Sequence, residues 1–122
     1  MKNILVVDDE SAIRLILNLA LKQAGYDVSE ACDGKEASQL LEQRQPDLLI
    51  TDLSMPEMEG GDLIQEVHTL YPDMPIIAMS GDLLDKIGIN IKTGDSSGAD
   101  YLLTKPFSVN DLMQTVKHAF GE

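Results

Sequence analysis

Polar side chains able to do chemistry follow short apolar runs at several places in this sequence. Carboxylates follow the first and third runs, a hydroxyl follows the fourth and an amine follows the fifth: Asp8 and Asp9, Asp52, Ser80, and Lys105. Three clustered carboxylates repel one another unless a cation joins them, and hard oxygen ligands suit Mg²⁺. One carboxylate could then attack phosphorus and form an aspartyl phosphate. The hydroxyl and the ammonium would bind the phosphoryl oxygens.

The order of apolar runs and amphipathic stretches predicts how these residues are positioned. Strands are predicted over residues 3–7, 27–31, 47–51, 75–79 and 101–104, and helical periodicity lies between most of them and after the last. Such alternation predicts parallel βαβ units with right-handed crossovers and helices on both faces of the sheet. Sites in such sheets form at the carboxyl ends of the strands. The polar residues should therefore meet at one edge.

Several element boundaries can also be predicted. Gly25 should close the helix that follows the first strand, and residues 54–61 should form a loop because of their Pro and Gly content. Ser108 or Asn110 should cap the last helix. Residues 81–100 contain Gly, Asn and Ser residues that weaken a helix there. The helix after the loop at 54–61 is expected to carry Leu63, Ile64, Val67 and Leu70. The inner face of the last helix is expected to contain Val109, Leu112, Met113, Val116 and Phe120.

Composition limits the classes of function. A chain of 122 residues with 43% hydrophobic content predicts one domain over residues 1–122. No apolar run approaches the roughly 18 residues of a membrane span, and the N-terminus does not resemble a signal peptide. A net charge of −12 opposes binding to nucleic acid. The single Cys32 excludes an internal disulfide and fits a reducing compartment, the cytoplasm.

Four motifs in order resemble those of the receiver domains of two-component response regulators. They are "VVDDE", "DLLITDLSMPEMEG", "IIAMSG" and "GADYLLTKPF", and the resemblance covers essentially the whole chain. It implies a flavodoxin-like, doubly wound α/β fold with a five-stranded parallel sheet in the order 2-1-3-4-5. It also implies a signalling module that takes a phosphoryl group from a sensor histidine kinase or histidine phosphotransfer domain. The phosphorylated form would regulate a downstream effector protein or output domain.

The resemblance assigns roles to individual residues of this chain. Asp52 would be the phosphoacceptor, and Ser80 and Lys105 would contact the phosphoryl group. A cis peptide bond would join Lys105 to Pro106. The Mg²⁺ ligands would be Asp9, Asp52 and the backbone carbonyl of Ser54, with Asp8 acting largely through water.

Other interpretations of the same residues remain open at this point. Asp8 and Asp9 could simply favour a helix N-terminus, and Asp52 and Lys105 are each ordinary when taken alone. A Mg²⁺-dependent phosphatase of the haloacid-dehalogenase type would need a second acid where this chain has Ser54. A degenerate receiver that only binds partners would lack chemistry residues that are present here. An independent enzyme is therefore not expected.

The chain departs from the receiver pattern at one strand. Receivers usually place an aromatic residue three positions before the active-site lysine, which is Leu102 here, whereas Tyr101 lies one residue earlier. One residue along a strand separates the two faces of a sheet. We therefore expect signalling to depend on residues 81–98 and little on rotation of an aromatic ring.

Overall fold

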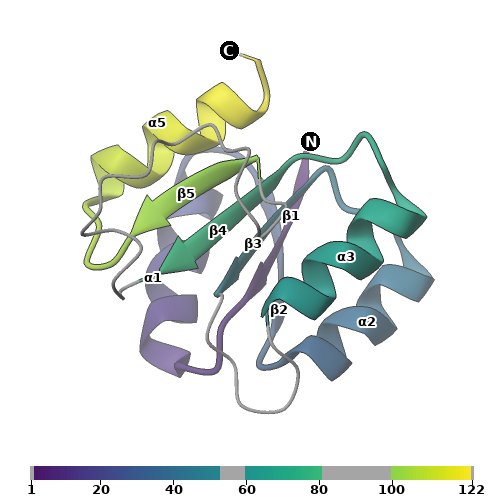
Figure 1. Ribbon diagram of the computed structural model, residues 1–122. Helices are drawn as coiled ribbons and strands as arrows, with labels where there is room; N and C mark the ends of the chain where they lie inside the picture. The colour runs from purple at the N-terminus through teal and green to yellow at the C-terminus, as the bar shows by residue number, and fades with distance from the viewer. Residues whose placement is uncertain (1, 53–59, 81–99, 122) are drawn as a thin grey trace.

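A computed structural model describes residues 2–52, 60–80 and 100–121 of the chain. Five parallel strands form one sheet in the order β2-β1-β3-β4-β5 (Figure 1). The strands are β1 Asn3–Val7, β2 Asp27–Ala31, β3 Leu48–Asp52, β4 Ile76–Ser80 and β5 Tyr101–Thr104. The predicted doubly wound sheet and its strand order are confirmed.

Helices cover both faces of the sheet. They are α1 Ser11–Gln23, α2 Gly34–Gln43, α3 Gly60–Leu70 and α5 Val109–Ala119. Figure 1 shows α2 and α3 on one face, with α1 and α5 on the other. Alternate residues of β1 enter the two cores: Leu5 and Val7 pack with α2 and α3, while Ile4 and Val6 pack with α1 and α5. Burial on both faces explains why the central strands are continuously apolar in sequence.

Two strands end one residue later than the sequence predicted. The parallel ladder continues to Asp52, which pairs with Met79, and Ser80 pairs with Thr104. Asp52 and Ser80 are therefore the last residues of β3 and β4, not the first residues beyond them. The shift arises because backbone pairing with a neighbouring strand, which a single apolar run does not encode, sets the end of a strand. Both residues still lie at the carboxyl edge of the sheet.

The predicted helix ends are partly confirmed. Gly25 follows the α1 C-cap with φ 98°, a conformation that suits glycine, and Ser108 caps α5 in a capping box with Asp111. Asn110 lies inside the helix. The prediction that Val109 lies on the inner face was wrong, because its side chain is 53% exposed at the start of α5. Leu70 lies in α3 as predicted, at the last position of the helix. No described helix is both long and apolar enough to span a bilayer.

Strand β5 runs in regular register beside β4. Tyr101 pairs with Ile77 and Leu102 pairs with Ala78. Leu102 is buried with the α2–α3 core, whereas Tyr101 packs against the α1–α5 core and donates a hydrogen bond from Oη to the His118 carbonyl. The two side chains thus enter opposite cores, as the sequence predicted. Residues 81–98 lie outside the described residues.

Candidate functional site

Lys105 brings together side chains from distant parts of the chain. Its Nζ lies 2.8 Å from Asp8 Oδ2, 3.3 Å from Asp52 Oδ2 and 3.8 Å from Glu10 Oε1. Asp8 is fully buried, Asp52 is 5% exposed, and the Lys105 side chain is 16% exposed. One partly buried ammonium therefore pairs with several carboxylates at the carboxyl edge of the sheet.

The turn from β1 into α1 determines the direction of the Asp8 carboxylate. Asp8 N donates to the Ala31 carbonyl and so extends the ladder with β2 beyond Val7. Asp8 Oδ1 accepts a 2.8 Å hydrogen bond from the Glu10 backbone, which fixes the turn before α1. The other oxygen, Oδ2, is left to face Lys105. Both Asp8 oxygens therefore have protein partners.

Lys105 reaches the site from the end of β5. The predicted cis Lys105–Pro106 peptide bond is confirmed. Burial lowers the pKa of the Lys105 ammonium, but the hydrogen bond that Lys105 donates to Asp8 and the charges of Asp52 and Asp8 outweigh burial and raise the pKa above its ordinary value. Lys105 is therefore a permanent cation here at neutral pH.

An acidic cluster lies beside this lysine. Carboxylate oxygens of Asp8, Asp9 and Glu10 lie within 4.8 Å of one another. Within the described part of the chain, no hydrogen bond or ion pair engages the exposed Asp9 carboxylate. Hard carboxylate oxygens clustered in this way fit a Mg²⁺ ion. Glu10 was not among the predicted ligands, although its place in the run of three acids was a usable signal.

The remaining predicted site residues are placed less completely. Ser80 ends β4 one position beyond the partner of Asp52, and nothing is described of its side chain. Ser54 lies outside the described residues. Sequence reasoning also missed Arg14, whose Nη1 donates a 2.6 Å hydrogen bond to the Asp8 carbonyl. The only feature of the sequence that could have indicated this contact is the position of Arg14 near the start of the helix that follows the three acids.

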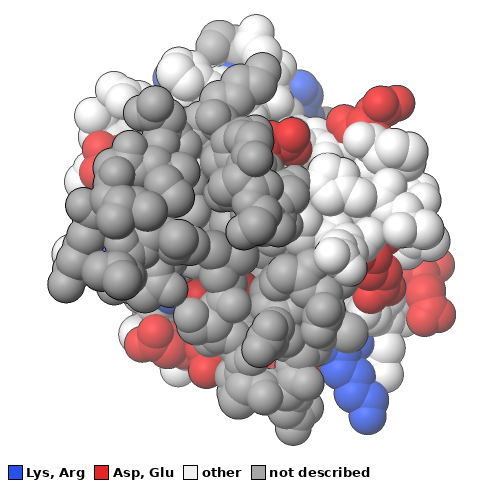
Figure 2. Space-filling model, viewed as in Figure 1, with Lys and Arg blue, Asp and Glu red and all other residues white. Residues whose placement is uncertain are grey.

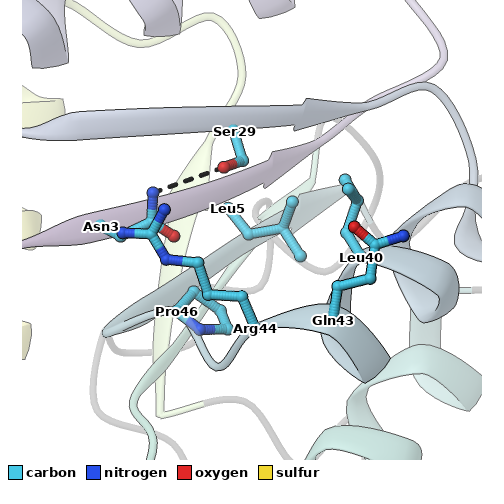
Figure 3. Close-up of a pocket in the computed structure, with 7 residues that line it drawn as sticks. All are labelled: Asn3, Leu5, Ser29, Leu40, Gln43, Arg44 and Pro46. Atoms are coloured by element: carbon cyan, nitrogen blue, oxygen red, sulfur yellow. Dashed lines mark hydrogen bonds between the residues drawn. The ribbon is translucent and has the colours of Figure 1, made fainter.

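A separate hollow lies near the amino-terminal end of β1, at the edge of the sheet opposite to the Lys105 site (Figure 3). Its lining consists of Asn3, Leu5, Ser29, Leu40, Gln43, Arg44 and Pro46, without a carboxylate. The described surface in Figure 2 shows acidic side chains in several places and few basic ones. Neither feature offers the combination of clustered carboxylates and a partly buried ammonium that the Lys105 site has.

The chain matches a family and several curated relatives. The family model described as the response regulator receiver domain matches residues 4–117. "Probable transcriptional regulator ycf27" of Guillardia theta is 40% identical over 118 residues, which cover 95% of this chain and 44% of that protein. "DNA-binding dual master transcriptional regulator RpaA" of Synechocystis is 37% identical, with 96% and 48% covered. The chain thus spans about half the length of these relatives.

Solved structures match over nearly the whole chain. Chemotaxis response regulator CheY4 of Vibrio cholerae has a TM-score of 0.86 and 30% identity, with 98% of each chain covered. Response regulator protein TrrA of Thermotoga maritima, solved in complex with Mg(2+)-BeF, has a TM-score of 0.84 and 32% identity, with 98% of this chain and 99% of that chain covered. The sheet and the arrangement of helices are therefore shared with these proteins.

Proposed function

This chain belongs to the response regulator receiver domain family, and we propose that its Asp52 accepts a phosphoryl group from a phosphohistidine. The donor is a sensor histidine kinase or a histidine phosphotransfer domain. The observation that carries this proposal is the Lys105 ammonium held between the buried carboxylates of Asp8 and Asp52. A lysine in this position neutralises the charge of an incoming phosphoryl group.

The transfer exchanges one bond to phosphorus for another. A carboxylate oxygen of Asp52 attacks the phosphorus atom and forms a P–O bond while the N–P bond to the donor imidazole breaks. The bonding electron pair leaves with the imidazole nitrogen, which takes up a proton from solvent. Lys105 and the Ser80 hydroxyl then bind phosphoryl oxygens. The position of Ser80 at the end of β4, beside the end of β3, supports this role.

Mg²⁺ is the cofactor that the donor set supports. In this proposal Asp9 and Asp52 are direct ligands, the Ser54 carbonyl is a third, and Asp8 acts through water. The engagement of both Asp8 oxygens by Glu10 and Lys105 supports the indirect role of Asp8. When bound, Mg²⁺ supplies positive charge that offsets the carboxylates and the phosphoryl oxygens.

An apolar surface beside the site supports a protein donor. Ile16 is 46% exposed on α1, with Leu15 and Leu19 exposed by 57% and 61%. A hollow next to Lys105 is lined by Ile13, Ile16, Lys105, Pro106 and Phe107. Exposed apolar patches of this kind mark interaction sites. We place the docking surface of the phosphodonor here, where it can bring a histidine to Asp52.

The chain works as a single receiver domain over residues 1–122 in this proposal. It assists its own phosphorylation and dephosphorylation and turns over no independent substrate. Its phosphorylated form regulates an effector protein or an output domain. That this domain itself binds no nucleic acid stays a prediction, supported by the net charge of −12. The single Cys32 supports work in the cytoplasm.

Labelling with a small phosphodonor tests the acceptor. With acetyl phosphate and Mg²⁺, the wild type should gain one phosphoryl group by intact mass, and Asp52→Asn should gain none. Asp47→Asn is the matched control, because Asp47 lies at the other end of β3. It should label normally. Labelling of Asp52→Asn at the wild-type level would overturn the assignment, and turnover of an added phosphoester would favour a phosphatase.

A further inference from the structure

A partly buried arginine holds the backbone of the acidic cluster. Arg14 Nη1 donates a 2.6 Å hydrogen bond to the Asp8 carbonyl, and the Arg14 side chain is only 19% exposed. Hydrogen bonds from a charged donor are stronger than neutral ones. This contact reaches the loop from the α1 side, whereas Lys105 reaches the Asp8 carboxylate from β5. The same residue is therefore fixed at both its backbone and its side chain.

Arg14 is itself held in place by a neighbouring strand. Its Nε lies 3.3 Å from Glu30 Oε1 on β2, and Asn18 Nδ2 donates to the other oxygen of Glu30. One carboxylate thus accepts hydrogen bonds from two successive turns of α1. The guanidinium fork is rigid, so an arginine anchored at Nε presents Nη1 in a defined direction. The chain of contacts runs from the outer edge of the sheet to the acidic loop.

The geometry points to a role for Arg14 that rests on the proposed function. The Asp8 carbonyl belongs to the same planar peptide unit as the Asp9 backbone nitrogen. Holding that carbonyl therefore sets the orientation from which the Asp9 side chain leaves the backbone. We propose that Arg14, supported by Glu30, is a positioning residue that aims the Asp9 carboxylate at the Mg²⁺ site.

Charge and position predict opposite effects on metal binding. Arg14 carries a positive charge next to a site for a divalent cation, so removing that charge alone should tighten Mg²⁺ binding. Losing the positioning contact should weaken Mg²⁺ binding. In other proteins, the loss of a residue that orients a metal ligand lowers metal affinity by about 10- to 100-fold. The direction of the change in Mg²⁺ affinity therefore separates the two roles.

The experiment measures Mg²⁺ affinity by calorimetric titration of the wild type, Arg14→Met, Arg14→Lys and Arg44→Met. Arg44→Met is the matched control, because Arg44 pairs with Asp27 at the surface far along the chain from the acidic loop. Arg14→Met should bind Mg²⁺ at least about 10-fold more weakly. Arg14→Lys should fall between Arg14→Met and the wild type, because lysine can donate to the Asp8 carbonyl but cannot also span to Glu30 as a fork. Arg44→Met should match the wild type.

A second readout separates positioning from general loss of structure. Acetyl phosphate labelling of Arg14→Met should be slow at low Mg²⁺ and return toward the wild-type rate when Mg²⁺ is saturating. If Arg14→Met does not fold, Arg14→Lys replaces it, because it keeps the positive charge, and it should weaken Mg²⁺ binding in the same direction. Unchanged or tighter Mg²⁺ binding in the folded variant used would overturn the proposal. Because titration of Mg²⁺ needs no phosphorylation, this result is independent of whether Asp52 is the acceptor.

Discussion

The two edges of the sheet both carry aspartates, and they use them differently. At the amino-terminal edge, Asp47 accepts a 2.7 Å hydrogen bond from the Asn3 backbone, and Asp100 accepts a 2.9 Å hydrogen bond from the Ile76 backbone. Asp27 pairs with Arg44 at 3.4 Å. Each of these carboxylates has a separate hydrogen-bond donor or cation as its partner. The negative charges at this edge therefore do not compete for one shared cation.

At the carboxyl edge, several carboxylates share one cation. Asp8 and Asp52 are buried, and both pair with Lys105, which also lies near Glu10. Crowding of negative charge in a buried place is unfavourable unless positive charge is supplied. The difference teaches that the carboxylates of the amino-terminal edge stabilise the ends of strands, whereas the carboxyl edge is arranged to receive a cation and a phosphoryl group.

The largest predicted effect comes from removing the shared cation. Lys105→Met should slow labelling of Asp52 by acetyl phosphate by about 10²-fold or more, as loss of a preorganised charge partner does. It should also lower the Mg²⁺-free stability by roughly 3 kcal/mol, because the ammonium that pairs with the buried carboxylates of Asp8 and Asp52 is removed. Labelling time courses and urea unfolding measure both.

The matched change at the other edge is Arg44→Met. Its ion pair with Asp27 is exposed, so its loss should cost at most about 1 kcal/mol and leave labelling unchanged. If the two variants had equal effects on labelling, the functional difference between the edges would be refuted.

An intermediate effect is predicted for metal-dependent stability. Mg²⁺ should raise the unfolding temperature of the wild type, by an amount equivalent to about 2.7 kcal/mol when Mg²⁺ is at 100 times its Kd. Asp9→Ala should lose most of this rise, and the Mg²⁺-free protein should become more stable because repulsion within the acidic cluster falls. Thermal unfolding with and without Mg²⁺ measures both changes.

Asp47→Ala serves as the control for the Asp9 change. It should lower stability by about 1.5–3 kcal/mol through loss of the charged acceptor for the Asn3 backbone. Its Mg²⁺ response should remain complete. A wild-type Mg²⁺ response in Asp9→Ala would remove Asp9 from the site.

The smallest predicted effect concerns Tyr101, which begins β5 at the amino-terminal side. Tyr101→Phe removes the exposed hydrogen bond to the His118 carbonyl and should cost about 0.5 kcal/mol. Labelling and the Mg²⁺ response should not change, because the ring packs in the core opposite Leu102. Slower labelling by acetyl phosphate, or weaker Mg²⁺ binding, in Tyr101→Phe would show that Tyr101 is coupled to the site.

Local patterns in the sequence were enough to predict most strands and helices and the edge of the sheet at which the site forms. Each apolar run of β1, β3, β4 and β5 is followed by a polar residue. Because these strands are buried on both faces, they form continuous apolar runs that can be recognised as strands before their pairing is known. Parallel βαβ order then places Asp8, Asp52 and Lys105 at one edge. These inferences use only local periodicity and the rule of right-handed crossovers.

The way in which charged groups pair at that edge depends on tertiary contacts that the sequence pattern does not specify. The last residues of β3 and β4 depend on pairing across strands, so the sequence placed their ends one residue early. The contacts of Arg14 with the Asp8 carbonyl and Glu30 join a helix, a loop and a strand that share no sequence pattern. Hydrogen bonds between elements depend on distances fixed by packing, and a side chain's residue type does not reveal which of several possible partners it meets.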